Sequence, residues 1–499
     1  MREIELIERA KGFGDSVAIR QGKQELSYRS LLNASERIAS ALVGPDGDLS
    51  ENRVALLCTQ GMEFAISQWG VWRAGGVCVP LSGSATESEW EHAITDSSPV
   101  KVLVHGECPP TLQSLCARLE IPILAFETAL LVEPGSLPRV EVHRRAMILY
   151  TSGTTNKPKG VVLSHFNLEA QIRSLVQAWH WTQTDRIPLF LPLHHIHGIV
   201  NVLSCALWSG AWIDTFGSFD MRVLLARVAD KTYTIFMAVP TIYVKLIQAI
   251  ETAEVDERLA WVNGFSEMRL MVSGSAALPA SVHKHWTNLT GQELLERYGM
   301  TEIGMAISNP LIGERRPGAV GVPLPGVEIR LYGENDTVIQ AENEPGEIQV
   351  RGPAVFREYW NQPKATIDSF DDGWFRTGDM AVLEKGYYRI MGRLSVDIIK
   401  SGGYKLSALE IEEVLLQHPS IQQCAVVGVP DSTWGEAVAV AIVSADPAPL
   451  EIDLLRAWCR DRMSPYKIPK LLRLVTELPR NAMGKVVKKS VQTLFHDSL

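Results

Sequence analysis

The chain has 499 residues, of which 46% are hydrophobic and 21% are charged, and its 48 basic and 57 acidic residues give a net charge of −9. This composition is that of a globular protein with about three structural units, and because no long Lys/Arg run occurs, binding to nucleic acid or to an anionic membrane surface is disfavoured. The seven cysteines form no CxxC pair and mostly stand in apolar runs, so we predict buried, reduced thiols.

The N-terminal stretch MREIELIERA is charged throughout, so it does not resemble a secretory signal, and its glutamates are unusual for a transit peptide. The longest charge-free apolar stretch, residues 197–213, contains Asn201 and Ser204 and falls short of the about 20 residues that span a bilayer. We therefore predict a core helix followed by a strand there, and no membrane span. The expected location is the cytoplasm, with an organelle matrix as the alternative for a processed form.

Short apolar runs alternate with helical patterns over the first two-thirds of the chain. The runs at 54–58, 102–104 and 147–150 are typical of buried strands. A helical apolar face begins at Leu168 and continues to Trp179, with Asn167 as its expected cap. This alternation predicts parallel α/β layers.

From about Gly318 the pattern changes to short alternating runs with frequent Gly and Pro, which predicts a compact β section. Farther on, Ser407 and Glu410 fit a capping box that opens a helix through Leu416, and strands are predicted at 424–430 and 437–444. The predicted fold class is α/β. A large N-terminal domain, 1–392, has two layered α/β subdomains and a small β-barrel-like subdomain, and a small α+β domain, 393–499, follows it.

The stretch YTSGTTNKPKG, residues 150–160, is poor in apolar side chains and directly follows the apolar run 146–149. Its glycines permit close backbone approach, and its hydroxyls, amides and lysines suit a polyphosphate. It is not a Walker A loop, because Pro158 stands where the second glycine belongs and Val161 follows Gly160. A polar surface hairpin is the alternative interpretation.

This stretch resembles [YF]TSGTTGxPKG, the phosphate-binding signature of AMP-forming acyl-CoA synthetases, peptide-synthetase adenylation domains and luciferases. Asn156 replaces the usual glycine of the signature. Asn tolerates a left-handed backbone better than other side chains, so we expect the turn to survive. The resemblance implies that ATP contacts Thr151, Ser152, Gly153, Thr154, Thr155 and Lys159.

Two further motifs follow in the family's order. YGMTE at 298–302 resembles YGxTE, in which Thr301 would contact the adenylate phosphate and Glu302 would hold Mg²⁺, a cation that prefers oxygen ligands. WFRTGD at 374–379 resembles [WF]-[FHY]-x-T-G-D, in which Asp379 would accept hydrogen bonds from the ribose hydroxyls. Alone, either motif could be an ordinary turn. The nucleotide contacts implied at the first motif are Tyr298, Gly299, Met300 and Thr301.

The C-terminal part carries three more matches. Gly392-Arg393 resembles the hinge before the family's mobile domain, and Arg393 would also touch the ribose, while Ser395 stands where relatives often carry a charge. The segment NAMGK, 481–485, resembles N-x-x-G-K, whose lysine, here Lys485, reaches the reacting carboxylate and the α-phosphate. The alternative for this lysine is a solvated basic face. The stretch implied to line the pantetheine channel is Ser401, Gly402 and Gly403.

The resemblance implies two half-reactions that consume ATP, Mg²⁺ and CoA. A substrate carboxylate first attacks the α-phosphorus of ATP, giving an acyl-adenylate and pyrophosphate. A thiol then attacks the activated carbonyl, and AMP leaves. The protein would act by positioning and by electrostatic stabilisation, without a nucleophile of its own.

Arg297 bears on the choice of acid, because most relatives have a small or neutral polar residue directly before YGxTE. An arginine in an acyl pocket is costly to desolvate without an anion, and a second carboxylate on the substrate would satisfy it. The alternative is that Arg297 pairs with Glu296 or Glu302.

The stretches LMVSGSAALP and LERYGMTEIGMAISNP resemble malonyl-CoA synthetases most. That resemblance implies that Arg297 and Ser275 hold the distal carboxylate. The segment PLHHIHG, 192–198, lies where relatives build the acyl pocket, which makes His195 a further candidate.

We therefore expect a ligase that joins malonate to CoA, with methylmalonate as a further candidate substrate. One alternative is a short- or medium-chain or aryl monocarboxylate–CoA ligase, and another is a stand-alone adenylation protein that loads a carrier thiol. A degenerate binding module is disfavoured by the intact motif residues. The oligomeric state stays open between monomer and homodimer. The motif residues that argue for an enzyme are Lys159, Glu302, Asp379, Arg393 and Lys485.

Overall fold

The chain folds into two compact units. In the computed structural model, unit 1 comprises residues 1–317, 321–328 and 350–375, and unit 2 comprises residues 318–320, 329–349 and 376–499. The boundary expected at 392–393 falls inside unit 2 and stays a prediction. The residues that the structure describes are 4–43, 47–58, 61–151, 158–217, 219–333, 337–402, 404–431, 433–445, 450–480 and 486–495.

Unit 1 contains a seven-stranded sheet with the order β19-β8-β7-β4-β3-β5-β6. The two strands that flank the YTSGTTNKPKG stretch, β7 and β8, belong to this sheet. Strand β3 pairs in parallel with β4 and β5, which confirms the expected parallel layer, whereas β7 and β8 form an antiparallel pair because a short loop joins them. The expected strands at 54–58, 102–104 and 147–150 are β3, β5 and β7. The bounds are β3 Arg53–Leu57, β4 Val77–Pro80, β5 Lys101–Val104, β6 Ile123–Ala125, β7 Arg145–Thr151, β8 Lys159–Ser164 and β19 Glu358–Tyr359.

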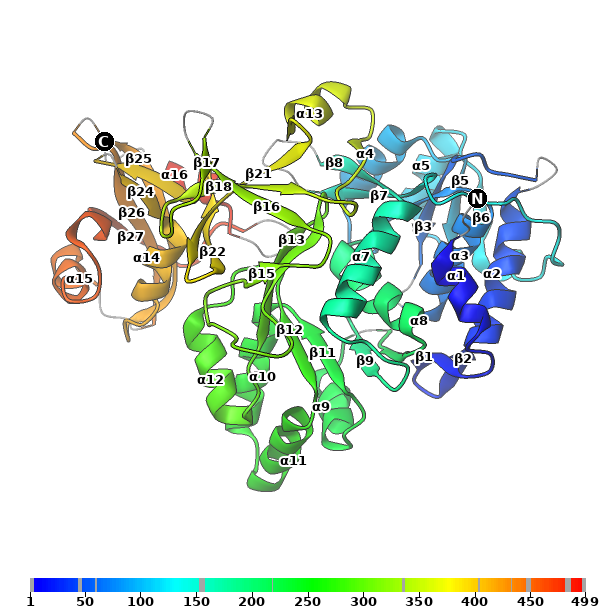
Figure 1. The fold of residues 1–499 in the computed structure, drawn as a ribbon, viewed down its shortest axis with the longest axis horizontal. Helices are drawn as coiled ribbons and strands as arrows, with labels where there is room; N and C mark the ends of the chain where they lie inside the picture. Colours follow the sequence, from blue (N-terminus) through cyan, green and yellow to red (C-terminus); the bar gives the residue numbers. More distant parts are fainter. Residues whose placement is uncertain are drawn as a thin grey trace. The chain divides into compact units, whose positions relative to one another are not determined.

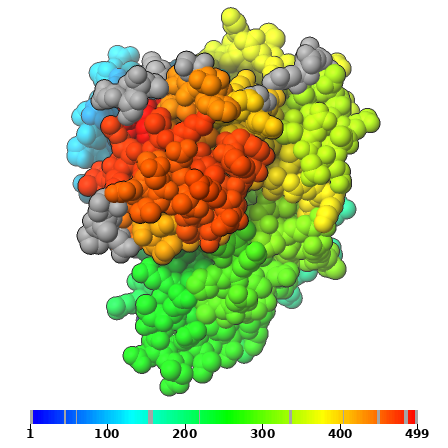
Figure 2. Space-filling view, turned by 90° about the vertical axis from the view of Figure 1, so that its left-hand side faces the viewer, coloured from blue at the N-terminus to red at the C-terminus, as the bar shows by residue number. Residues whose placement is uncertain are grey.

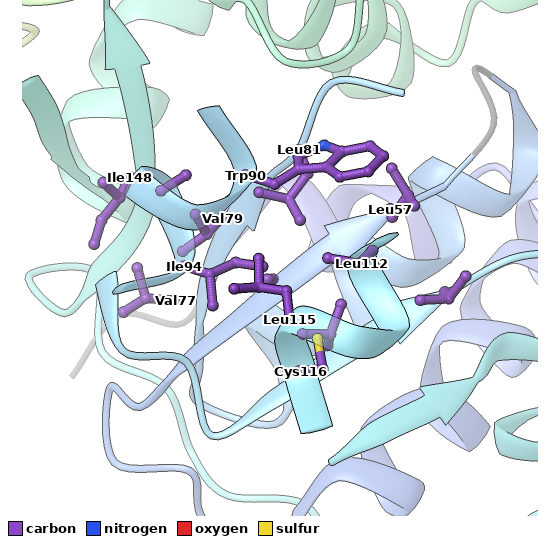
Figure 3. Close-up of a cluster of buried hydrophobic side chains, with 14 of the residues drawn as sticks. Leu57, Val77, Val79, Leu81, Trp90, Ile94, Leu112, Leu115, Cys116 and Ile148 are labelled. Carbon is purple, nitrogen blue, oxygen red and sulfur yellow. The ribbon is translucent and has the colours of Figure 1, made fainter. Parts of the chain in front are cut away.

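An apolar cluster joins this sheet to the helices α4 (Glu87–Ser97) and α5 (Pro110–Arg118). Figure 3 shows Trp90 and Ile94 of α4 beside strand residues such as Val79. Ile148 of β7 and Val162 of β8 belong to the same cluster. Because each large apolar side chain that is fully buried contributes about 1.5–3 kcal/mol, strands β7 and β8 are anchored firmly in the core.

Two more sheets complete the α/β part of unit 1. One has the order β2-β1-β10-β9, and the other has the order β11-β12-β13-β14-β15. Strands β11, β12 and β13 are parallel, whereas β13 and β14 are antiparallel and carry the YGMTE motif. Helices α9 to α12, drawn in green, gather around this sheet (Figure 1). The strand bounds are β1 Val17–Gln21, β2 Gln24–Ser27, β9 Arg186–Leu189, β10 Trp212–Thr215, β11 Ile235–Ala238, β12 Leu270–Ser273, β13 Leu295–Met300, β14 Gly304–Ser308 and β15 Val322–Pro323. Strand β20 (Phe370–Asp371) belongs to neither sheet and pairs with β21 (Trp374–Glu384).

The helices of unit 1 correct one expectation. Helix α7 is capped by Ser164, whose Oγ accepts the Asn167 N–H at 3.2 Å while Asn167 Oδ1 accepts the Ser164 N–H at 2.9 Å. Asn167 as the cap is therefore wrong, because the helix begins directly where β8 ends and Asn167 is its third residue. The helix bounds are α1 Glu5–Lys11, α2 Tyr28–Val43, α3 Met62–Arg73, α6 Phe126–Ala129, α7 His165–Ala178, α8 Cys205–Ser209, α9 Met221–Ala229, α10 Pro240–Thr252, α11 Val255–Ser266, α12 Ala280–Thr290 and α13 Pro363–Asp368.

The apolar segment at 197–213 forms a helix and then a strand, as expected, but its first part is a π-helix. This π-helix, η2 (His197–Ser204), runs into α8 and then reaches β10. The 3.6-residue apolar period used to predict helices does not distinguish a π-helix from an α-helix. π-helical turns are rare and occur frequently at functional sites.

Unit 2 contains a β section and a small α+β part. The β section has the order β17-β16-β18-β21, with β22 paired to β21, and the second sheet has the order β24-β23-β26-β25, with β27 paired to β26. Strands β16, β18 and β21 each have residues in unit 1 as well. The strand bounds are β16 Glu328–Tyr332, β17 Val338–Ile339, β18 Gly346–Arg351, β21 Trp374–Glu384, β22 Tyr387–Arg393, β23 Ile398–Ser401, β24 Tyr404–Ser407, β25 Ile421–Asp431, β26 Gly435–Ser444 and β27 Leu471–Leu474.

Helices cover both faces of the second sheet of unit 2. Successive residues of a strand point to opposite faces, so Val426 packs with α14 and α15, whereas Val427 packs with α16. Figure 2 shows the C-terminal part of this unit, in orange and red, as one continuous surface. The bounds are α14 Ala408–Leu415, α15 Ile452–Cys459, the 3-10 helix η3 Pro465–Lys467 and α16 Lys488–Thr493.

The capping box expected at Ser407 forms only in part. The Ser407 hydroxyl accepts the Glu410 N–H at 3.1 Å, which confirms the start of α14. The Glu410 carboxylate instead accepts a hydrogen bond from Lys467 Nζ at 2.5 Å. A tertiary ion pair has therefore replaced the local half of the box.

The structure bears on two general expectations, the state of the cysteines and the absence of a membrane span. All seven cysteines are free thiols, and Cys78, Cys116, Cys205 and Cys459 are buried. Within the described ranges, no helix combines the length and the apolar character that crossing a membrane requires.

A mostly buried cation stabilises unit 2. Lys488 Nζ donates to Glu412 Oε1 and to Val426 O at 2.7 Å, and it lies 3.8 Å from Asp397 Oδ1. Replacing Lys488 with Met would leave two mostly buried carboxylates without their cation, so we expect the free energy of unfolding to fall by about 3 kcal/mol. Urea denaturation followed by circular dichroism measures this, with the exposed Lys489→Met as the matched control. Equal midpoints for the two variants would contradict a stabilising role.

Candidate active site

The two described ends of the glycine- and hydroxyl-rich loop lie together. Thr151, at the end of β7, pairs directly with Lys159, at the start of β8. Pro158 O lies 2.8 Å from His92 Nε2, so α4 contacts the base of the loop. Both predicted nucleotide contacts at the loop ends thus stand on the anchored hairpin. The predicted contacts that lie outside the described residues are Ser152, Gly153, Thr154 and Thr155.

The YGMTE motif forms the β13–β14 hairpin. Tyr298, Gly299 and Met300 are the last residues of β13 and pair with β14. Thr301 and Glu302 fall in the turn that follows, which the Ile303 N–H closes onto Met300 O at 3.2 Å. Glu302 is buried, with 5% of its surface exposed.

Tyr359 connects these two motifs. Its hydroxyl donates to Glu302 Oε1 at 3.0 Å, and Lys159 Nζ lies 4.7 Å from the centre of its ring. A cation at this distance from an aromatic face is attracted by about 0.5–2 kcal/mol. The lysine of the first motif and the carboxylate of the second therefore share one aromatic partner. Sequence reasoning missed Tyr359, whose only signal was an aromatic residue with a polar tip in the run FREYW.

The residues around Glu302 fit a magnesium ion that is held mainly by a phosphate substrate. Among the described residues, no group of three or more His, Cys, Asp or Glu side chains is placed to hold a metal. Mg²⁺ commonly uses one or two carboxylates together with substrate phosphates and water. A buried carboxylate oriented by a tyrosine hydroxyl suits that role.

Changing Tyr359 separates its two contacts. Tyr359→Phe keeps the ring beneath Lys159 but removes the hydrogen bond to Glu302, so we expect Mg–ATP to bind about 5-fold more weakly, since one such bond contributes ~1 kcal/mol. Tyr359→Leu removes the ring as well and is expected to weaken binding further. Titration calorimetry of Mg–ATP measures both changes. Equal affinities for the Phe and Leu variants would show that the ring contributes nothing.

Arg297 is a buried cation in the middle of a sheet. It lies on β13 between β12 and β14, with 4% of its surface exposed. Its Nη2 donates to Ser275 Oγ at 3.3 Å, whereas its Nε is buried without a partner among the described residues. Burial lowers the pKa of Arg297 to about 9. Within the described part of the chain, Arg297 forms no ion pair with a carboxylate.

The backbone beside Arg297 is shaped for the guanidinium. A Cβ on Gly274 would lie 2.5 Å from Arg297 Cζ and Nε, so the guanidinium could not keep its present position beside any residue other than glycine. The next residue, Ser275, has a φ of 69°, in the left-handed region that non-glycine residues rarely adopt. Such backbone strain concentrates at functional sites.

The acyl segment contributes a second histidine, His197, beside the expected His195. The His195 ring contacts the His194 ring at an interplanar angle of 53°, with 4.3 Å between ring centres. His197, two residues later at the start of η2, places Nδ1 3.1 Å from Ser275 Oγ. The structure therefore brings His197 to the Arg297–Ser275 pair, and a contact between His195 and substrate stays a prediction. His197 is part of the predicted acyl segment 192–198, but the sequence alone does not show which of its histidine rings contacts Ser275.

In unit 2, the two residues expected at the ribose lie side by side. Asp379 on β21 pairs with Arg393 on β22, and Arg393 donates to Asp379 from Nε at 2.9 Å and from Nη2 at 3.3 Å. The Arg393 N–H also donates to Asp397 Oδ2 at 3.0 Å. A bidentate pair of this kind fixes both side chains.

The other expected residues of unit 2 are described in part. Ser401 is buried at the end of β23, and Gly402 has a φ of 58°, where a Cβ would lie 2.8 Å from Trp434 Cε3. Gly403 and Lys485 lie outside the described residues. Arg480 and Val486, the described residues on either side of 481–485, form an antiparallel bridge.

Comparison with known proteins places these features in one family. The pattern described as AMP-binding enzyme matches residues 6–360, and the pattern described as AMP-binding enzyme C-terminal domain matches residues 410–485. The mitochondrial malonate–CoA ligase of Homo sapiens is 43% identical, with 100% of this chain and 93% of that protein aligned. The crystal structure of ATP-bound MatB from Rhodopseudomonas palustris is 32% identical, covers 100% of both chains and has a TM-score of 0.89.

A further similar structure was solved as a product complex. It is a malonyl-CoA ligase in a ternary complex with methylmalonyl-CoA and AMP, and it is 37% identical. The alignment covers 94% of this chain and 97% of that one, with a TM-score of 0.69.

Proposed function

The chain belongs to the family of AMP-binding enzymes, and we propose that it is the AMP-forming ligase that joins malonate to coenzyme A. The observation that carries the choice of acid is the buried Arg297, which binds Ser275 and forms no ion pair with a described carboxylate. A buried guanidinium is stable beside an anion, and the far carboxylate of a short diacid supplies one. Methylmalonate presents the same carboxylate, so it is proposed as a second substrate.

The proposed reaction has two steps. One carboxylate of malonate attacks the α-phosphorus of ATP, the bond to the β-phosphate oxygen breaks, and malonyl-AMP and pyrophosphate form. The CoA thiol then releases its proton to solvent and attacks the acyl carbonyl, and AMP leaves with the electron pair of the acyl–oxygen bond. Magnesium neutralises charge on the phosphates when it is bound, and Glu302 is proposed to hold it.

Each motif has a proposed role. The 151–159 loop and Thr301 bind the phosphates, and Lys485 stabilises the charge that builds on the α-phosphate and the attacking carboxylate. Asp379 and Arg393 bind the ribose. We retain 1–392 as the adenylation domain and 393–499 as the C-terminal domain. The proposed residues of the CoA channel are Ser401, Gly402 and Gly403.

An acid panel tests the proposal. The protein is incubated with ATP, Mg²⁺, CoA and one acid at a time, and the thioester is identified by mass. We expect malonyl-CoA and methylmalonyl-CoA in preference to acetyl-, hexanoyl- or benzoyl-CoA. A preference for any monocarboxylate would overturn the choice of acid while leaving the family intact. Replacing CoA with a phosphopantetheinylated carrier tests the carrier-loading alternative.

The cytoplasm is the proposed location, with an organelle matrix as the alternative. The relative from Homo sapiens is named as mitochondrial, which supports the alternative. Fractionation of cells that express the tagged chain separates the two.

A further inference from the structure

The Ser275 hydroxyl lies between two nitrogen groups. Arg297 Nη2 donates to Ser275 Oγ at 3.3 Å, and His197 Nδ1 lies 3.1 Å from the same oxygen. His197 is 5% exposed, whereas Ser275 itself is exposed. The hydroxyl is thus held from the protein side and reachable from the other.

The number of protons limits how these groups can bond. A serine hydroxyl has one proton to donate and two lone pairs to accept. When Ser275 gives its proton to a substrate carboxylate, Arg297 and His197 must both donate to Oγ. Nδ1 of His197 then carries the proton, and Nε2 does not. Burial and the nearby Arg297 cation lower the pKa of His197 well below its ordinary value, so the ring is neutral and holds a single N–H.

The other nitrogen of His197 argues that the ring is kept for this contact. His197 Nε2 is buried and has no hydrogen-bond partner among the described residues. A buried polar atom without a partner destabilises the fold, and an apolar side chain of similar size would avoid that cost. Packing alone therefore does not account for a histidine here.

We propose that His197 is a positioning residue for the distal carboxylate of the acid substrate. Its Nδ1–H fixes the Ser275 hydroxyl, so that the hydroxyl proton points away from Arg297 and toward the carboxylate. The inference rests on the proposed function and adds a specificity residue to it. His197 acts through Ser275 and does not touch the substrate.

Three variants test the proposal. His197→Asn places an amide near the position of Nδ1, His197→Gln places one near the position of Nε2, and His197→Leu removes both nitrogens. We expect the Leu variant to raise KM for malonate about 10-fold, the worth of one hydrogen bond to a charged network. The Asn variant is expected to stay within about 3-fold of the wild type, whereas the Gln variant resembles Leu.

The controls separate specificity from folding. KM for ATP and the rate of AMP formation with acetate, an acid without a distal carboxylate, are expected to be unchanged in all three variants. Tm of the Leu variant is expected to equal or exceed that of the wild type, because an unpartnered polar atom has been removed.

The outcomes distinguish the two proposals. Rescue by Gln and not by Asn would show that Nε2 contacts the substrate directly, and it would overturn the positioning role. A Leu variant with unchanged KM for malonate would overturn it as well, with the proposed function left standing. A wild-type enzyme that forms no malonyl-CoA would overturn the proposed function and this inference together.

Discussion

Replacing Arg297 with methionine is expected to lower kcat/KM for malonate about 100- to 1,000-fold, which corresponds to ~3–4 kcal/mol. The reason is that the distal carboxylate would be desolvated without a cation beside it, which leaves a buried charge unpaired. Pyrophosphate release at varied malonate concentration measures the loss. KM for ATP is expected to stay within about 2-fold, because Arg297 contacts Ser275 and lies against Gly274, not the loop ends.

The stability of this variant distinguishes recognition from structure. Removing one member of a buried ion pair is strongly destabilising, but Arg297 forms no ion pair with a described carboxylate. We therefore expect Tm of Arg297→Met to equal or exceed that of the wild type. A large fall in Tm, or an unchanged kcat/KM for malonate, would contradict the role in substrate recognition.

Gly274→Ala is a matched variant that keeps the charge. The added Cβ would lie 2.5 Å from Arg297 Cζ and 2.7 Å from Nη1, so the guanidinium has to move. Because misplacement by about 1 Å costs up to about 100-fold, we expect a loss of about 10- to 100-fold with malonate. Acetate serves as the control acid, and its turnover is expected to be unaffected. An equal loss with both acids would indicate a general disturbance of the site.

Replacing Lys485 with alanine is expected to lower the rate of adenylate formation about 100- to 1,000-fold and to spare the second half-reaction. Negative charge builds on the phosphoryl oxygens as the carboxylate attacks, and removing one preorganised donor has an effect of this size. In the second step the leaving AMP phosphate is already formed, so the lysine is not required. Pyrophosphate release measures the first step, and thioester formation from supplied malonyl-AMP measures the second.

A neighbouring lysine supplies the control for Lys485. Lys489 is exposed on α16, so Lys489→Ala is expected to leave both half-reactions within about 2-fold of the wild type. If Lys485→Ala slowed both half-reactions equally, the assignment to the first step would be wrong. If both lysine variants behaved alike, a solvated basic face would be the better description of this segment.

The sequence by itself determined the strands, the fold class and the family. Apolar runs such as 147–150 form strands because a buried run of a few residues is too short for a helix and satisfies its backbone in a sheet, and both the length and the apolar character are local properties of the sequence. The phosphate-loop motif is also local, because a short stretch of glycines and hydroxyls suffices to specify it. The start of α7 was misplaced because Ser164 and Asn167 both suit a helix cap, and the end of β8 decided between them.

Tertiary structure alone decided which side chains meet. His197 and Ser275 are 78 positions apart, and Glu302 and Tyr359 are 57 positions apart, so no pattern along the chain brings either pair together. Whether Arg297 has an acidic partner likewise depends on strand register, because the register of β13 with β12 and β14 determines which side chains lie next to Arg297. Local residue preferences select helices and strands, whereas contacts across the fold arise from packing, which depends on the whole chain at once.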